Sequence, residues 1–135
     1  MFEFHGWATI HADDSEDPSG GDLEIRERDL TKKIQDAIRE VEAVNREFHL
    51  HRMNGTLHLV FCGDHNHFDE SILGFFRRLS LIAPHSYGKL HVRDDEDSHG
   101  FNNTMRQWTL ARGRAIESID QSMSPCIPTL EAENP

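Results

Sequence analysis

This sequence lacks the residues needed to build a disulfide framework or a membrane-spanning helix. Only two of its 135 residues are cysteines, Cys62 and Cys126, which is too few for a disulfide framework. Its apolar runs are a few residues long, whereas a transmembrane helix needs about 20. The first residues include neither a basic segment nor a long apolar stretch, so we expect no secretory signal, no membrane partner and a soluble cytoplasmic protein.

Basic residues are also scarce. The chain has 14 Lys and Arg against 24 Asp and Glu, which gives a formal net charge of −10. A protein that binds the phosphate backbone would carry the opposite sign, so DNA and RNA are not expected as direct partners. With 36% hydrophobic residues, the length fits a single domain, 1–135, built around one core.

The acidic excess is concentrated in two segments and the tail, where no basic residue interrupts it. Ten of the 24 acids lie there, namely Asp13, Asp14, Glu16, Asp17, Asp94, Asp95, Glu96, Asp97, Glu131 and Glu133. The other 14 acids equal the 14 bases in number. Clustered carboxylates in loops either serve solvation alone or attract a basic partner and raise its association rate. The sequence leaves both interpretations open.

Hydrophobic periodicity predicts two helices and five strands. Apolar residues recur at helical spacing over 22–47, where Asp22 can cap the start, and over 67–83, where Asn66 can cap the start and Pro84 follows the end. Asn54–Gly55 between two alternating runs predicts a hairpin. Strands are expected at 2–11, 48–53, 56–62, 87–94 and 103–113.

The element order predicts an α+β fold with a mostly antiparallel five-stranded sheet and both helices on one face. The first six elements follow a ferredoxin-like pattern, in which right-handed crossovers give the spatial strand order 4-1-3-2. The fifth strand is expected to pair with the fourth as a hairpin and to extend the order to 5-4-1-3-2. Residues 115–135 are predicted to form a mostly extended tail, because Pro125 and Pro128 exclude a helix or a central strand.

Strand alternation also predicts which side chains the helices leave uncovered. If the aliphatic sides of the strands face the helices, Trp7 lies on the other face with six of the ten histidines, His5, His11, His49, His51, His58 and His91. That face is either a solvated surface, partly covered by the tail, on which histidine is a polar filler, or a surface that binds a partner or responds to pH.

Motifs for metal binding and catalysis are weak. His49-x-His51 and His65-x-His67 supply pairs of imidazoles, but zinc sites use three or four protein ligands, and no Cys-x-x-Cys or HExxH motif is present. P-loop, GxGxxG and GxSxG motifs are missing as well. We therefore expect no metal, no cofactor and no enzymatic activity. The alternatives are a small metal- or ligand-binding enzyme that uses the histidine-rich face, and a structural adaptor.

Four short motifs carry a family resemblance. They are FEFHGW at 2–7, SYGKLHVRDDED at 86–97, WTLARG at 108–113 and SPCIP at 124–128. In their order and spacing they resemble the immunity protein 7 family of bacterial polymorphic toxin systems. The resemblance implies a cytosolic immunity protein that binds a secreted or contact-delivered toxin and blocks it, and it brings no catalytic residues.

Charge and exposure then select the candidate partner-binding residues. The acidic residues of 94–97 and 13–17 can attract a basic C-terminal toxin domain, and the 94–97 turn can insert into its cleft. Trp7 with His5, His49 and His51 can provide the contacts of a central anchor, because interface hot spots favour aromatic side chains. Arg93, Trp108 and Arg112 can equally serve to hold the last predicted hairpin and the tail.

Overall fold

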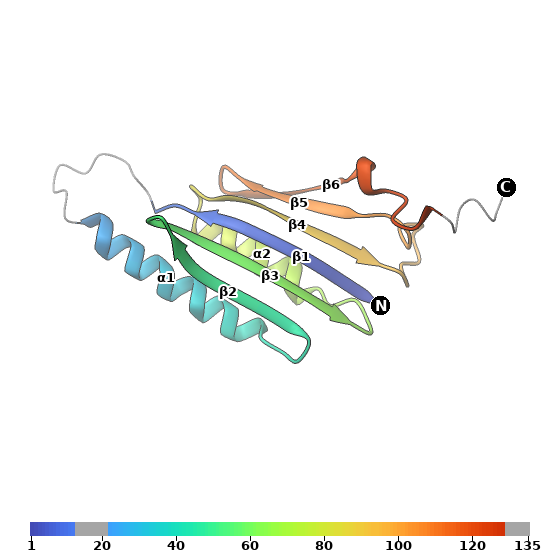
Figure 1. Cartoon of the computed structure of the whole chain (residues 1–135), viewed down its shortest axis with the longest axis horizontal. Helices are drawn as coiled ribbons and strands as arrows, with labels where there is room; N and C mark the ends of the chain where they lie inside the picture. Colours follow the sequence, from blue (N-terminus) through green and yellow to red (C-terminus); the bar gives the residue numbers. More distant parts are fainter. Residues whose placement is uncertain (13–21, 129–135) are drawn as a thin grey trace.

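The structure is a computed structural model that describes residues 1–12 and 22–128. Its elements follow the order β1 (Phe2–Ile10), α1 (Asp22–Val41), β2 (Arg46–Met53), β3 (Thr56–His65), α2 (Ser71–Ile82), β4 (Tyr87–Asp94), β5 (Arg106–Ala111), β6 (Arg114–Ile119) and the short 3-10 turn η1 (Gln121–Met123). The strands form one antiparallel sheet in the order β2-β3-β1-β4-β5-β6, and both helices lie on one face of it (Figure 1). The predicted α+β class, the helix placement and the relative order of the first five strands are confirmed.

The predicted number of strands is wrong, because residues 114–119 form a sixth strand instead of the start of a tail. The strand expected over 103–113 covers only Arg106–Ala111. Arg112 and Gly113 then adopt positive φ angles of 54° and 72° and reverse the chain, so that Arg114 pairs with Ala111. With β5 and β6 added beyond β4, the ferredoxin-like description holds only roughly.

Both helices are shorter than their apolar spacing predicts. The first ends at Val41 instead of 47, and Asn45, with a φ of 70°, turns the chain into β2. The second begins at Ser71 instead of 67. The predicted cap at Asn66 is wrong, since Asp69 Oδ1 accepts the hydrogen bond from the Ser71 amide at 2.9 Å.

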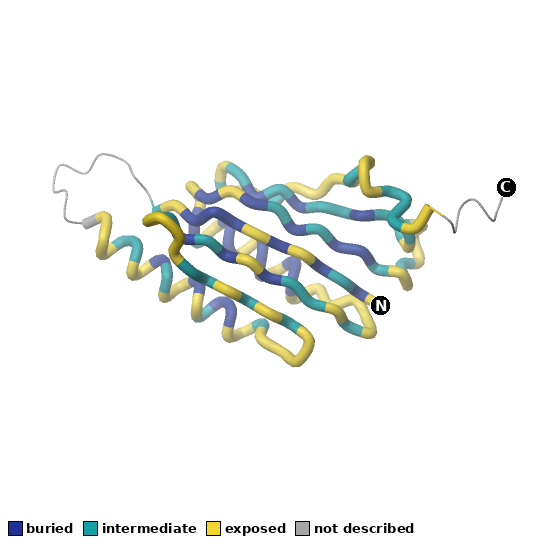
Figure 2. Tube along the Cα trace, in the orientation of Figure 1, coloured by how far each residue is buried: buried dark blue, intermediate teal, exposed yellow. Residues whose placement is uncertain are grey.

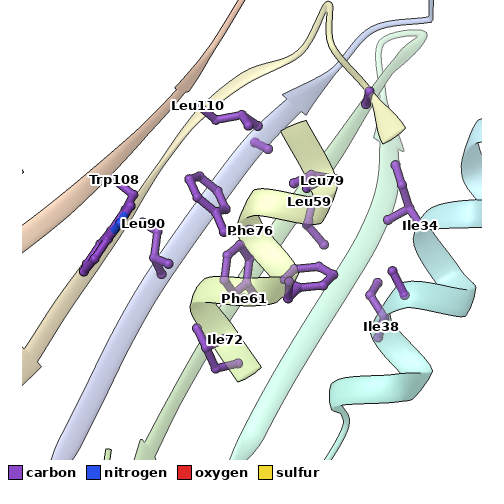
Figure 3. Packing of buried hydrophobic residues seen from close by; sticks show 14 of the residues in the cluster. Ile34, Ile38, Leu59, Phe61, Ile72, Phe76, Leu79, Leu90, Trp108 and Leu110 are labelled. Carbon is purple, nitrogen blue, oxygen red and sulfur yellow. The ribbon is translucent and has the colours of Figure 1, made fainter. Parts of the chain in front are cut away.

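The core lies between the sheet and the two helices. Ile34 and Ile38 of α1 and Phe76 of α2 meet strand residues such as Leu59 and Leu90 (Figure 3). Along β1 the alternation is clear up to Trp7, because Phe2, Phe4, Ala8 and Ile10 are at most 4% exposed while Glu3, His5 and Trp7 are more accessible (Figure 2).

Gly6 occupies a core-facing position of β1 beneath an aromatic ring. The Phe61 side chain covers it so closely that a Cβ on Gly6 would lie 2.1 Å from the ring. Phe61 itself is 1% exposed. Glycine is therefore required here by packing, and the next residue, Trp7, points to the opposite face of the sheet.

Candidate partner-binding surface

The face of the sheet opposite the helices, here called the open face, carries the predicted tryptophan and histidines. Residues paired across antiparallel strands share a face. Trp7 pairs with Val60 and Lys89, and His5 pairs with Cys62 and His91. The same registers place His49 opposite Val60 and His51 opposite His58. The prediction of a shared face is thus confirmed for His5, His49, His51, His58 and His91, whereas His11 follows the end of β1.

Trp7 stands at the centre of the open face on a strand with two neighbours on one side and three on the other. It is 44% exposed, and its ring meets Tyr87 edge to face at 6.3 Å. Tyr87, Val60 and Ile116 are similarly exposed apolar residues on this face. Strand alternation in the sequence already places Val60 and Tyr87 on the open face. Ile116 was missed because β6 was not expected.

The histidines of the open face mostly contact carboxylates. His5 Nε2 lies 3.3 Å from Glu3, and His49 Nε2 lies 3.4 Å from Glu47. His91 is less exposed and lies 3.3 Å from Asp120. The rings of His51 and His58 are 6.0 Å apart. In residues 1–12 and 22–128, no group of three or more His, Cys, Asp or Glu is arranged to hold a metal ion.

Two carboxylates of the acidic turn 94–97 are used to build the turn itself. Asp94 Oδ1 accepts a hydrogen bond from the Glu96 amide at 3.1 Å. Asp97 Oδ2 accepts from the amides of Phe101 and His99 at 3.0 and 2.9 Å. These backbone hydrogen bonds, led by that from Phe101, hold the pKa of Asp97 below its usual value.

The other two carboxylates of the turn contact the first residue and the β3–α2 loop. Asp95 pairs with the amino group of Met1. Glu96 accepts from His67 Nδ1 at 3.0 Å, and this hydrogen bond lowers the pKa of Glu96. Both side chains still reach solvent, at 37% and 54% exposure. They are the two members of the turn that a partner can contact without dismantling it.

The structure brings most of the candidate residues together. Phe2 pairs with Asp94, so the acidic turn lies at the end of the sheet where β1 begins, five residues from Trp7. At about 3.3 Å per residue this is about 17 Å, within the reach of an interface of about 800 Å² per partner. His49 and His51 lie two strands away on β2. The candidates Asp13, Asp14, Glu16 and Asp17 lie outside the described residues.

The segment 120–127 covers part of the open face near the acidic turn, which is one of the two interpretations that the sequence leaves open. The Asp120 amide donates to the Met105 carbonyl at 2.9 Å, and the Cys126 amide donates to the Asn103 carbonyl at 3.0 Å. Ser124 Oγ accepts from the Met105 amide at 2.9 Å. Between this segment and β1 lies a hollow, here called the tail hollow, that the sequence pattern did not indicate.

These features define a class of small α+β protein in which one face of the sheet builds the core and the other presents an exposed aromatic residue beside acidic groups. Within residues 1–12 and 22–128, no helix is long and apolar enough to cross a membrane. No curated protein and no solved structure matches the chain.

The chain belongs to the immunity protein 7 family, since the family model described as Immunity protein 7 matches residues 1–132. Membership implies an immunity protein directed against a bacterial toxin and indicates a non-enzymatic role. The resemblance drawn from the four sequence motifs is thereby confirmed.

Proposed function

We propose that this protein neutralises one cognate toxin by binding its toxin domain directly through the open face. The partner is the C-terminal domain of a polymorphic or contact-delivered toxin and has a basic surface. The immunity protein acts in the cytoplasm of the cell that makes it, without catalysis and without a cofactor.

The observation that carries this proposal is the exposure of Trp7 at the centre of the sheet. An indole that is 44% exposed beside Val60 and Tyr87 leaves apolar area on the sheet that a bound partner can remove from water. Hot spots of interfaces are enriched in tryptophan and lie near the centre of the contact. The position of Trp7 fits this description.

The acidic turn supports the same assignment through charge. Asp95 and Glu96 retain exposed carboxylates at the edge of the open face, and the whole chain carries a net charge of −10. Charges at the rim of an interface act chiefly on the rate of association. A basic toxin domain would therefore approach the acidic end of the face first and then bury Trp7.

A genetic test addresses the function as such. The expected toxin gene is a large gene immediately upstream, with its toxin domain at the C-terminal end. Expression of that domain alone should stop growth, co-expression of this protein should restore growth, and the two should copurify. A toxin domain that remains lethal in the presence of this protein would contradict the proposal.

A matched pair of variants tests the surface. Val60→Arg places a cation beside Trp7 on the open face, whereas Leu81→Arg makes the same change at a residue of α2 that is 77% exposed. The first variant should weaken binding of the toxin domain by about tenfold or more and the second should leave it unchanged. Equal effects of the two variants would assign binding to another surface.

A further inference from the structure

We propose that the tail hollow takes an aromatic side chain of the toxin domain, whose surface around that side chain is basic. This inference rests on the proposed function and adds to it a second anchoring point, in which the toxin contributes the inserted group. The tail hollow lies next to Trp7, because His5 lines it and is two residues from Trp7 on the same face of β1.

The tail hollow is a built feature of the fold. Its floor is formed by β1 and β4, and its wall is the segment 120–127. Asn103 fixes this wall at its far end, since its side chain donates to the Ile127 carbonyl at 3.0 Å and accepts from the Ile127 amide at 2.9 Å. Together with the hydrogen bonds to Met105, these contacts hold the wall open without a partner in place.

The lining suits an aromatic ring. Met105, Met123, Pro125 and Ile127 supply apolar and sulfur atoms, and Met123 and Ile127 remain 48% and 37% exposed. Methionine sulfur makes favourable contacts with aromatic rings. Arg93 also lines the hollow, and its guanidinium is a planar cation of the kind that stacks well on aromatic faces.

Arg93 is incompletely satisfied by the protein itself. It is 9% exposed, and its Nε has no hydrogen-bond partner among the described residues. Its nearest carboxylate contact in the structure joins Nη1 to Glu3 at 3.9 Å, which is longer than a hydrogen bond. A ring stacked over the guanidinium would add a favourable contact to a cation that is already desolvated.

The charges around the tail hollow indicate what surrounds the inserted ring. Arg93 on the floor faces Glu3, while His5 contacts Glu3 and His91 contacts Asp120. With neutral histidines these groups sum to one negative charge, and the acidic turn lies at the same end of the sheet. A lysine or arginine head would be repelled by Arg93 at the floor but attracted by the carboxylates at the rim. An aromatic residue flanked by basic residues is therefore complementary to this site.

Two cysteines on the open face provide a direct test. Cys126 lines the tail hollow, whereas Cys62 lies on the other side of β1 on the same open face and reports how far the toxin covers that face in general. Iodoacetamide labelling of each thiol, followed by mass spectrometry, is measured on the free protein and on its complex with the toxin domain. Occupation of the hollow should slow the labelling of Cys126 at least tenfold. Labelling of Cys126 at the free rate in a saturated complex would overturn the inference.

Affinity measurements give the second test. Met123→Ala with Ile127→Ala should weaken binding of the toxin domain by about tenfold or more, and Arg93→Lys, which keeps the charge but loses the planar group, should also weaken it. Leu81→Ala is the matched control, and thermal melting checks that each variant is folded. If the double alanine variant and Arg93→Lys are both folded and both bind with wild-type affinity, no aromatic side chain of the toxin occupies the tail hollow.

The outcomes separate this inference from the proposed function. If the wild-type protein fails to bind the toxin domain, the proposed function fails and the inference falls with it. If it binds while Cys126 stays fully reactive, only the inference fails. If the protein alone forms a dimer that protects Cys126, the occupant is a second copy and the toxin assignment is overturned.

Discussion

Replacing Trp7 with alanine should reduce binding far more than folding. Trp7 is 44% exposed, so about 110 Å² of a side chain of about 250 Å² is left for a partner to cover. At about 25 cal/mol per Å² this area is worth about 2.7 kcal/mol, which corresponds to a roughly 100-fold increase in Kd. We expect the larger part of this change in the dissociation rate, because apolar anchors act after the encounter.

The same substitution should cost the folded protein much less. The indole lies on the face of the sheet opposite both helices, and its ring contacts the exposed Tyr87. Loss of this packing should lower the free energy of unfolding by about 1–2 kcal/mol. For a domain of this size, that shift lowers Tm by a few degrees.

Titration calorimetry with the toxin domain measures Kd, and scanning calorimetry of the free protein measures Tm. Leu81→Ala is the control for removing an exposed apolar side chain elsewhere. A Kd within twofold of the wild type would refute the anchor role of Trp7. A fall in Tm of more than about 10 °C would show that the indole supports the core, against the reasoning from strand alternation.

Three further predictions concern the acidic turn and the core. Asp95→Asn with Glu96→Gln should slow association with the toxin domain several-fold at low salt and reduce its salt dependence, as measured by stopped flow. Gly6→Ala should destabilise the protein by about 1–3 kcal/mol in urea unfolding, because the new methyl group collides with the buried ring of Phe61. Asp97 has a lowered pKa, so its contribution to stability is present above the usual carboxyl pKa of about 3.9 and is lost as pH falls through the lowered value. Asp97→Asn should therefore be less stable than the wild type at pH 7 and lose less stability on acidification.

Each of these predictions has a clear contrary result. If Asp95→Asn with Glu96→Gln associates with the wild-type salt dependence, the acidic turn does not contribute to the first encounter with the toxin domain. Wild-type stability of Gly6→Ala would mean that the ring above it moves freely. If the stability of Asp97→Asn falls on acidification as much as that of the wild type, the backbone hydrogen bonds to this carboxylate do not stabilise the turn.

Strand alternation predicted the open face because the two faces of the sheet differ in chemistry. In β1, a core-facing Phe4 or Ala8 alternates with an outward His5 or Trp7, so a single register satisfies both faces. This pattern was enough to place Trp7 and the strand histidines. It was also enough, with the element order, to derive how the first five strands lie side by side.

The parts that the sequence could not predict depend on uncommon conformations or on distant contacts. Arginine rarely adopts the positive φ of Arg112, so the turn into β6 carries only the weak signal of the single glycine Gly113. The partners of the acidic turn are also remote, since Met1 is 94 residues from Asp95 and His67 is 29 residues from Glu96. The tail hollow needs the same kind of long-range contact, between Met105 and segment 120–127.

The close approach of Phe61 to Gly6 has a consequence for how this sequence can vary. Gly6 is fixed by packing against the core, whereas Trp7 beside it is 44% exposed and its ring packs against the exposed Tyr87. Along such a strand, packing against the core constrains the inward residues, whereas the outward residues are free of that constraint. Under the proposed function, mutations at outward positions would retarget the protein to a different toxin while the inward positions, and the fold with them, stay unchanged.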